Sequence, residues 1–129
     1  MSKEFVTTEN APSAIGPYSQ AVKAGGFLFV SGQVALVPRD TSKKLNNPDI
    51  KTETRQVLNN LKGVVEAAGT SLESAVKMTV FMSDMNNYGA INEVYGEFFK
   101  DSKPARAAVE VSALPLGAGV EIEGIFKLE

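Results

Sequence analysis

Charged side chains interrupt two segments near the C-terminus that otherwise have the apolar character of strands. Arg106 follows Lys103-Pro104-Ala105, and Glu121 lies in the run VEIEGI. A guanidinium presents parallel N–H donors that match two carboxylate oxygens, so Arg106 is a candidate anchor for a small carboxylic acid. The alternative is an ion pair at the surface or at a subunit contact, because most arginines are solvated.

Glu121 is the matching candidate for handling water. Strand alternation places it opposite Val120 and Ile122 and beside Ile125. Partial burial there raises the pKa of a carboxyl, and a neighbouring arginine lowers it. Such a carboxylate can position or activate a water molecule, or it can simply pair with an arginine or lysine. Glu123 is two residues further along the same strand, so it is expected on the same face as Glu121.

Three further polar side chains are candidates for lining a site. Tyr18 follows Gly16-Pro17 in a rigid turn, where its hydroxyl closes over a pocket or its ring merely packs on the next strand. Ser31 is expected to be a hydrogen-bond donor, because no histidine is present to make it a nucleophile. Asn92 lies one turn before Tyr95 in a predicted helix and is either solvated or part of the site.

The composition excludes several classes of chemistry. The 129 residues contain no histidine and no cysteine, which removes catalytic triads, thiol nucleophiles, disulfides and HExxH metal sites. Acid-base chemistry must use Glu, Asp, Tyr, Lys or bound water, and we expect neither a metal nor another cofactor. The net charge of −2, from 13 basic and 15 acidic residues, argues against nucleic acid as a partner.

Length and hydropathy predict one domain spanning residues 1–129. No run of about 18 apolar residues is present to span a bilayer. The N-terminal MSKEFVTTENAPSA also lacks the hydrophobic core of a secretory signal. We therefore expect no membrane contact and a cytoplasmic location, or the mitochondrial matrix if a presequence has been removed.

Apolar periodicity and Gly/Pro punctuation predict six strands and two helices. The first helix, 50–68, has apolar residues at three- and four-residue steps and ends at Gly69. The second helix, 84–100, begins at the N-cap candidate Asp84. The predicted strands are 4–8, 20–24, 27–35, 75–83, 106–112 and 119–127.

The order of these elements predicts a half-covered sheet. A crossover between parallel strands is right-handed, so both helices should lie on one face. The other face then carries Phe81, Ile125 and every second residue of the segment 27–30. Thr79, Glu121 and Glu123 lie on the same face. A partly apolar uncovered sheet is typically buried against another subunit, so we expect a homo-oligomer.

The direction of Arg106 follows from the alternation of its strand. Ala107, Val109 and Val111 are the apolar alternate residues of this strand, so we expect them to face the helices. Arg106 alternates with them, so we expect it on the helix-free face. If the last two strands formed a simple hairpin, Arg106 would face the region of Ile125 instead of Glu121. Either these strands are not direct neighbours, or the site is completed by an adjacent subunit.

Four segments taken together resemble the RidA/YjgF family of 2-iminoacid deaminases. They are IGPYSQAV at 15–22, FVSGQV at 29–34, the Asn92 and Tyr95 pair, and KPARAAVEVSALPLGAGVEIEGI at 103–125. The resemblance covers nearly the whole chain, in the family's order and spacing. It implies a chorismate-mutase-like α+β fold, with a six-stranded mixed β-sheet, two α-helices packed on one face, and a homotrimer with clefts between subunits.

The resemblance implies hydrolysis of reactive 2-enamine and 2-imino acids, such as 2-aminoacrylate, to 2-keto acids and ammonia. Arg106 would hold the substrate carboxylate and Glu121 would position or activate the attacking water. Tyr18, Ser31 and Asn92 would line the cleft. An imine is already electrophilic, so orientation worth on the order of a few kcal/mol is enough, and histidine is dispensable.

Position 108 departs from the family pattern. Many relatives have cysteine there, whereas this chain has Ala108, whose backbone groups would face the imine nitrogen. The main chain can do this whatever side chain it bears, so the deaminase interpretation is intact. Thiol-dependent regulation is not expected.

Two other functions stay open. A non-catalytic trimer would use the same cleft to capture small carboxylates for sensing or regulation. Some relatives are credited with endoribonuclease or translation-inhibitor activity, which the missing histidine and the net negative charge disfavour in this chain.

Overall fold

The computed structural model describes residues 2–129 and contains one six-stranded sheet and two α-helices. All eight predicted elements are present in the predicted order, with bounds shifted by a few residues. Among the described residues, no helix is long and apolar enough to cross a membrane. The elements are β1 (Glu4–Val6), β2 (Ala21–Ala24), β3 (Phe27–Gln33), α1 (Ile50–Ala67), β4 (Ala75–Met82), α2 (Tyr88–Phe99), β5 (Ala105–Glu110) and β6 (Val120–Lys127).

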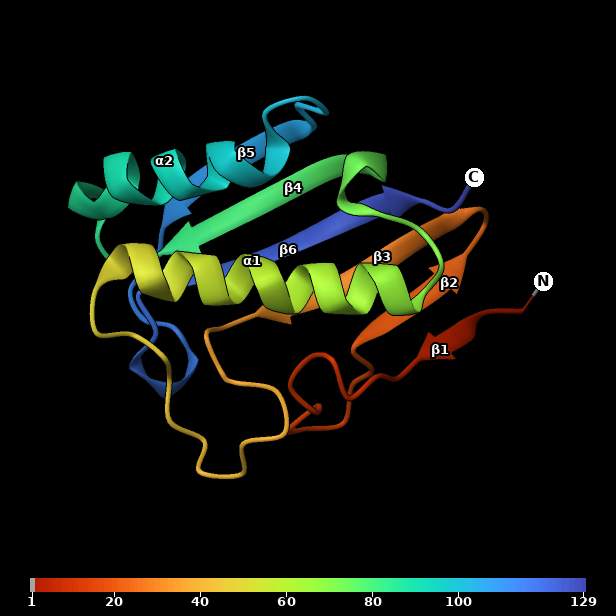
Figure 1. Cartoon of the computed structure of the whole chain (residues 1–129), viewed down its shortest axis with the longest axis horizontal. Helices are drawn as coiled ribbons and strands as arrows, with labels where there is room; N and C mark the ends of the chain where they lie inside the picture. The colour runs from red at the N-terminus through yellow and green to blue at the C-terminus, as the bar shows by residue number, and fades with distance from the viewer. Residues whose placement is uncertain (1) are drawn as a thin grey trace.

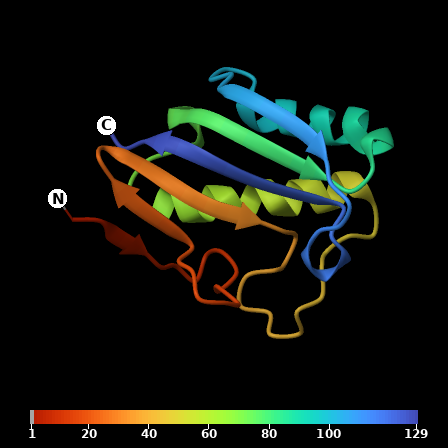
Figure 2. The same ribbon diagram turned by 180° about the vertical axis from the view of Figure 1, so that it is seen from behind.

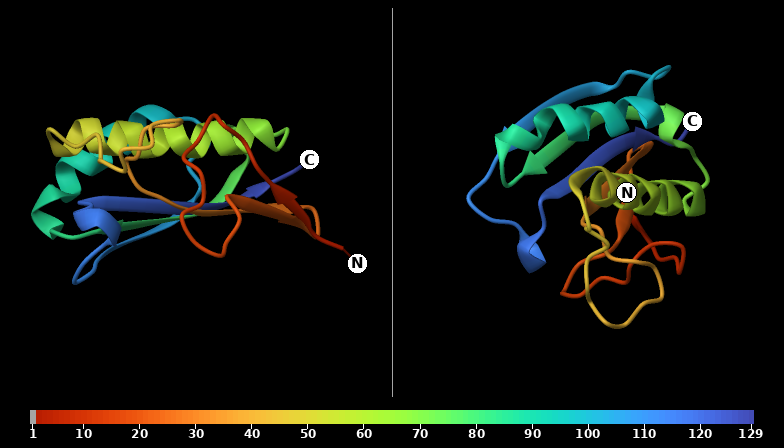
Figure 3. Two further views of the ribbon diagram at one scale, coloured as in Figure 1. Left: turned by 90° about the horizontal axis from the view of Figure 1, so that it is seen from below. Right: turned by 60° about the vertical axis from the view of Figure 1, so that its left-hand side comes forward.

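The sheet has the strand order β1-β2-β3-β6-β4-β5 (Figure 1). The β4 and β5 strands are parallel and the other neighbours are antiparallel, so the sheet is mixed. Both helices lie in one layer on one face of the sheet, as the edge-on view in Figure 3 shows. The predicted α+β arrangement is therefore confirmed.

Helix α1 is defined at both ends by local sequence. The side chain of Asp49 accepts a hydrogen bond from the backbone N–H of Thr52 at 2.8 Å, which caps the first turn. Gly69 follows the last turn with φ of 93°, the left-handed conformation predicted for it. Between these ends, the apolar stripe packs on the sheet, and five of its residues are fully buried: Val57, Leu58, Leu61, Val64 and Val65.

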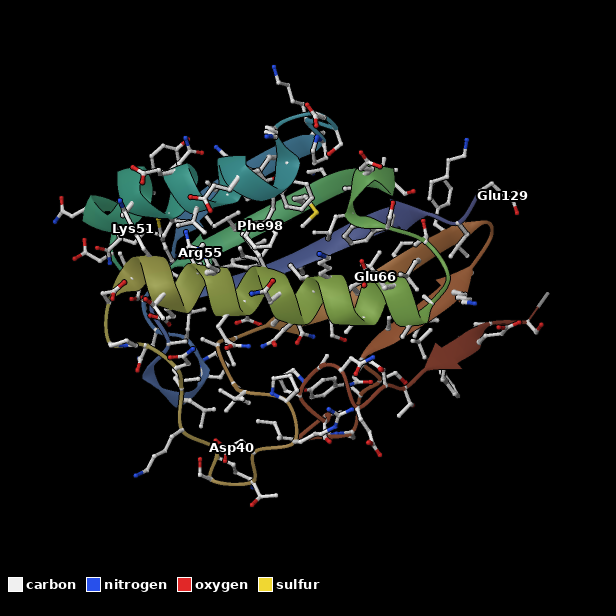
Figure 4. The ribbon with its side chains drawn as sticks, in the orientation of Figure 1. Asp40, Lys51, Arg55, Glu66, Phe98 and Glu129 are labelled. Atoms are coloured by element: carbon white, nitrogen blue, oxygen red, sulfur yellow. The ribbon has the colours of Figure 1, made fainter. Side chains whose placement is uncertain are left out.

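Helix α2 begins later than predicted. Asp84 does act as a cap, but it accepts from the N–H of Asn86 at 2.9 Å and closes a short 3₁₀ turn, Met85–Asn87. The α-helix starts at Tyr88. Lys51 and Arg55, labelled in Figure 4, reach from α1 to carboxylates of α2, with the Arg55–Glu97 pair at 3.0 Å. The two helices are thereby linked across their outer surface.

The second face of the sheet has no helix over it, as the view from behind in Figure 2 shows. Large apolar side chains lie exposed there: Phe27 is 39% exposed, Phe29 43% and Val109 40%. The half-covered sheet predicted from the sequence is confirmed. Its burial against further copies of the chain stays a prediction.

Candidate active site

Arg106 points toward α2, so its predicted position on the helix-free face is wrong. Its register partner on β4 is Met78, which is fully buried beneath the helices, and paired residues of neighbouring strands share a face. The error came from assigning the apolar parity of β5 to the core. In this edge strand, Ala107 and Val109 face the open side of the sheet, and that side is itself apolar.

Three side chains of α2 hold the guanidinium of Arg106. Its Nη1 donates to Asn92 Oδ1 at 2.7 Å, and its Nη2 donates to the hydroxyl of Tyr88 at 2.7 Å. The guanidinium carbon also lies 4.7 Å from the ring centroid of Tyr95. Positions 88, 92 and 95 share one face of a helix, because residues three and four apart are neighbours there. This explains the three-residue spacing between Asn92 and Tyr95 in the sequence.

The surroundings of Arg106 leave its charge uncompensated. The other two arginines of the chain pair with carboxylates, Arg39 with Glu9 at 3.5 Å and Arg55 with Glu97 at 3.0 Å. Within residues 2–129, no carboxylate lies within ion-pair distance of Arg106, and its acceptors are an amide and a phenol. A surface ion pair within the chain is therefore not what holds it.

Tyr95 remains neutral beneath the guanidinium. Burial raises the pKa of its hydroxyl to about 12, although the positive charge of Arg106 acts in the opposite direction. At neutral pH the phenol is therefore protonated and supplies no negative charge. The guanidinium of Arg106 is therefore held by side chains of α2 with no carboxylate among its partners.

A second group of candidate residues lines a cavity of about 440 Å³ that includes Tyr18, Ser31, Gly32 and Glu121. The hydroxyl of Ser31 donates to the carbonyl oxygen of Ser19 at 2.6 Å, in keeping with the donor role predicted for it. Tyr18 is 50% exposed at the rim of this cavity. Neither Arg106 nor Asn92 lines it.

Glu121 is half-buried in this cavity, on the open face of the sheet. Burial and the like charge of Glu123 both raise the pKa of its carboxyl. Its side chain lies over Gly32, where an added methyl group would come within 2.9 Å of the carboxyl carbon. The β3–β6 register shifts between Val30 and Gln33, so an irregularity in β3 and a missing side chain together make room for the carboxylate.

One chain does not bring Arg106 and Glu121 together. The β4 strand lies between β5 and β6, so the last two strands are not neighbours and the hairpin alternative is excluded. Met78 pairs with both Arg106 and Gly124, which places Arg106 two strands across and three residues along from Glu121. This corresponds to roughly 10 Å in each direction, and the two side chains leave opposite faces.

Ala108 lies on the same face as Arg106, two residues along the edge strand. Its register partner is the buried Val80, and its side chain packs against the core. The candidate residues therefore form two groups. We call Arg106, Asn92 and Ala108, with Tyr88 and Tyr95, the arginine group; we call Tyr18, Ser31 and Glu121 the glutamate group.

Tyr88 and Glu53 are not among the site residues predicted from the sequence. Tyr88 is one helical turn before Asn92, and this spacing is the signal that would have found it. Glu53 is only 4% exposed and accepts from the N–H of Gly119 at 2.7 Å, so it holds the chain two residues before Glu121. Burial raises the pKa of Glu53 above its ordinary value, although the hydrogen bonds from the backbone of Gly119 and Val120 act in the opposite direction. In the sequence, Glu53 lies four residues before Val57, so its carboxylate falls on the apolar stripe of α1. This position is the signal that would have found it.

Comparison with known proteins decides the family. A family model described as endoribonuclease L-PSP matches residues 8–127, nearly the whole chain. This chain belongs to that family, the RidA/YjgF family. The match includes both groups of candidate residues, and the resemblance noted in the sequence is confirmed.

Similar proteins of the RidA/YjgF family cover almost the full length of the chain. A RutC family protein of Pyrococcus horikoshii is 54% identical over 123 residues, covering 95% of this chain and 96% of its own. The 2-iminobutanoate/2-iminopropanoate deaminase of Mus musculus is 46% identical over 123 residues, covering 95% and 90%. The crystal structure of E. coli TdcF with bound serine has a TM-score of 0.89 and 39% identity, covering 96% and 98%. The family thus includes reactive-intermediate deaminases.

Proposed function

We propose that this protein hydrolyses reactive 2-enamine and 2-imino acids, such as 2-aminoacrylate, to 2-keto acids and ammonia. The observation that carries the proposal is the guanidinium of Arg106, held by neutral acceptors with no carboxylate paired to it. Such a group is suited to the carboxylate of a small acid. The mouse relative is named as a deaminase of this class, and TdcF holds serine, another small carboxylate.

The proposed reaction needs few groups. An enamine such as 2-aminoacrylate first tautomerises to its 2-imino acid, with a proton leaving the nitrogen and another joining the terminal carbon. The substrate carboxylate pairs with Arg106, and a water molecule held by Glu121 adds its oxygen to the carbon of the C=N bond. Glu121 takes the proton released by that water and returns a proton to the nitrogen. As the C–N bond of the resulting carbinolamine breaks and the C=O bond forms, the carbinolamine hydroxyl gives up its proton and the nitrogen takes one, again through Glu121, leaving the 2-keto acid and ammonia. The raised pKa of Glu121 suits a carboxyl that both accepts and donates a proton.

The proposed site is completed between two copies of the chain. Arg106 and Glu121 lie on opposite faces of one sheet, so a substrate that contacts both needs the arginine group of one copy and the glutamate group of another. The exposed apolar face of the sheet gives a surface on which copies can pack. We propose the homotrimer implied by the family resemblance, with clefts between subunits. We also propose that the protein is located in the cytoplasm or the mitochondrial matrix.

The test is ammonia release from freshly generated 2-aminoacrylate. Replacing Arg106 by alanine should lower kcat/KM by about 10- to 100-fold, because it removes a charge-assisted pair of hydrogen bonds to the carboxylate. The Arg106→Lys variant keeps the charge but loses the pair of parallel N–H donors, so it should recover only part of the activity. The matched control is Arg55→Ala, which removes an arginine paired with Glu97 on the outer surface.

The outcomes separate this proposal from its alternatives. A wild-type protein that releases no ammonia but binds 2-keto acids would instead be a sensor or a regulatory trimer. RNA cleavage by the wild type that Arg106→Ala leaves undiminished would favour the endoribonuclease activity named in the family description.

A further inference from the structure

Tyr88 contacts Arg106 and has no part in the reaction proposed above. Its hydroxyl accepts from Arg106 Nη2 at 2.7 Å, while Asn92 Oδ1 accepts from Nη1 at the same distance. The Tyr88 ring also lies 5.7 Å from the guanidinium carbon. Tyr88 is 38% exposed, whereas Tyr95, which packs under the same guanidinium, is 7% exposed. Tyr88 is therefore at the outer side of the arginine group.

The two hydrogen bonds together fix the plane of the guanidinium. Each terminal nitrogen gives one N–H to a neutral acceptor, and the remaining N–H groups are available to a ligand. With only the Asn92 bond and the Tyr95 ring in place, the plane could still swing about Nη1. A carboxylate is bound by two parallel N–H groups only when this plane has the right orientation, so the second bond bears directly on recognition.

The chemistry of the acceptor also matters. An acidic residue in place of Tyr88 would orient the guanidinium equally well but would neutralise the charge that attracts a substrate. A phenol accepts a hydrogen bond without carrying a negative charge at neutral pH. The exposure of Tyr88 further indicates that its hydroxyl contributes little to the packing of α2. The buried residues of this helix are Ile91, Val94, Tyr95 and Phe99.

We propose that Tyr88 is a positioning residue, whose hydroxyl orients Arg106 so that the guanidinium binds both oxygens of a planar carboxylate. This orientation gives the site its preference for 2-keto and 2-imino acids over their uncharged amides. This inference rests on Arg106 as the substrate anchor, as in the proposed function. It adds a residue and a stated specificity to that site.

The experiment compares wild type with Tyr88→Phe, which keeps the ring and removes the hydroxyl. Binding of pyruvate and of pyruvamide is measured by calorimetry, and turnover of 2-aminoacrylate is measured in parallel. Loss of one hydrogen bond should weaken pyruvate binding and raise KM by about 3- to 10-fold, with kcat changed less than about twofold. Pyruvamide binding should be unaffected. The matched control is Thr70→Val, which removes a hydroxyl bonded to the carbonyl of Lys127, far along the chain from Arg106.

Each result bears on a different claim. Tyr88→Phe with unchanged pyruvate affinity and unchanged KM overturns the role of Tyr88 and leaves the deaminase proposal standing. An equal loss of affinity for pyruvate and pyruvamide also overturns it, because the effect would then be structural. A wild type that binds pyruvate, loses affinity in Tyr88→Phe and shows no turnover overturns the deaminase proposal alone. A wild type that binds no 2-keto acid at all overturns the inference together with its anchor.

Discussion

Arg106 and Glu121 lie on opposite faces of one β-sheet, separated by the β4 strand and offset by three residues along the strands. Arg106 is held against α2, whereas Glu121 lies over Gly32 in the cavity of the open face. The side chains that would hold a carboxylate and a water are thus fixed independently of each other. If both act on one small substrate, as proposed, the second side chain must come from another copy of the chain.

Gly32→Ala tests whether the placement of Glu121 matters. A methyl group there would come within 2.9 Å of the carboxyl carbon and 3.1 Å of Cγ of Glu121. The side chain can swing aside, so we expect a small loss of stability but a fall in kcat of about 10- to 100-fold. The control is Gly96→Ala, where nothing lies within 4 Å of the added methyl group. Equal kcat for Gly32→Ala and wild type would show that the position of the carboxylate is unimportant.

The pH dependence of activity should report the raised pKa of Glu121. If its ionised form is the base, kcat/KM rises with pH through that pKa, which lies above the ordinary value of 4.5. Glu123→Gln removes a like charge that contributes to the raised pKa, so the acidic limb of the profile should move to lower pH. A limb that stays in place, or moves to higher pH, would contradict this assignment.

The same raised pKa affects stability in a defined direction. The folded chain binds the Glu121 proton more tightly than the unfolded chain does. Its contribution to stability is therefore full below the ordinary pKa of 4.5 and is lost as pH rises through the raised value. Glu121→Gln should flatten the pH dependence of Tm in this range, relative to wild type at the same protein concentration.

Glu53→Ala tests how the start of β6 is held. The substitution leaves the N–H of Gly119 without its buried acceptor, so we expect the free energy of unfolding to fall by about 1–3 kcal/mol. Urea unfolding at fixed protein concentration measures this. Glu66→Ala, an exposed glutamate of the same helix labelled in Figure 4, should change the free energy by less than about 0.5 kcal/mol. Similar effects of the two substitutions would mean that the hydrogen bond to Gly119 is unimportant.

The sequence predicts the elements well because their local signals agree. The apolar stripe of α1 and the alternation of β4 each have a single period, and Gly69 adopts the conformation that ends the helix. The start of α2 is less predictable, because Asp84 can cap either a 3₁₀ turn or an α-helix. Its side chain makes the same kind of hydrogen bond in both.

The candidate site is only partly readable from sequence. The alternation of β5 does not reveal which face is covered, because Ala107 and Val109 are apolar yet lie on the open side. That ambiguity is what misplaced Arg106. The position of β4 between β5 and β6 is a long-range pairing that no local pattern encodes. Tyr88 and Glu53 were missed because each acts through a residue distant in the sequence, Arg106 and Gly119.

Subunit mixing tests whether one site takes Arg106 from one copy of the chain and Glu121 from another. Arg106→Ala and Glu121→Gln chains are unfolded, mixed in equal amounts and refolded together, with each variant refolded alone as the control. Random assembly gives about a quarter of the clefts both intact side chains, so the mixture should recover about a quarter of wild-type deaminase activity. Mixed oligomers with no more activity than the separate variants would contradict the shared site.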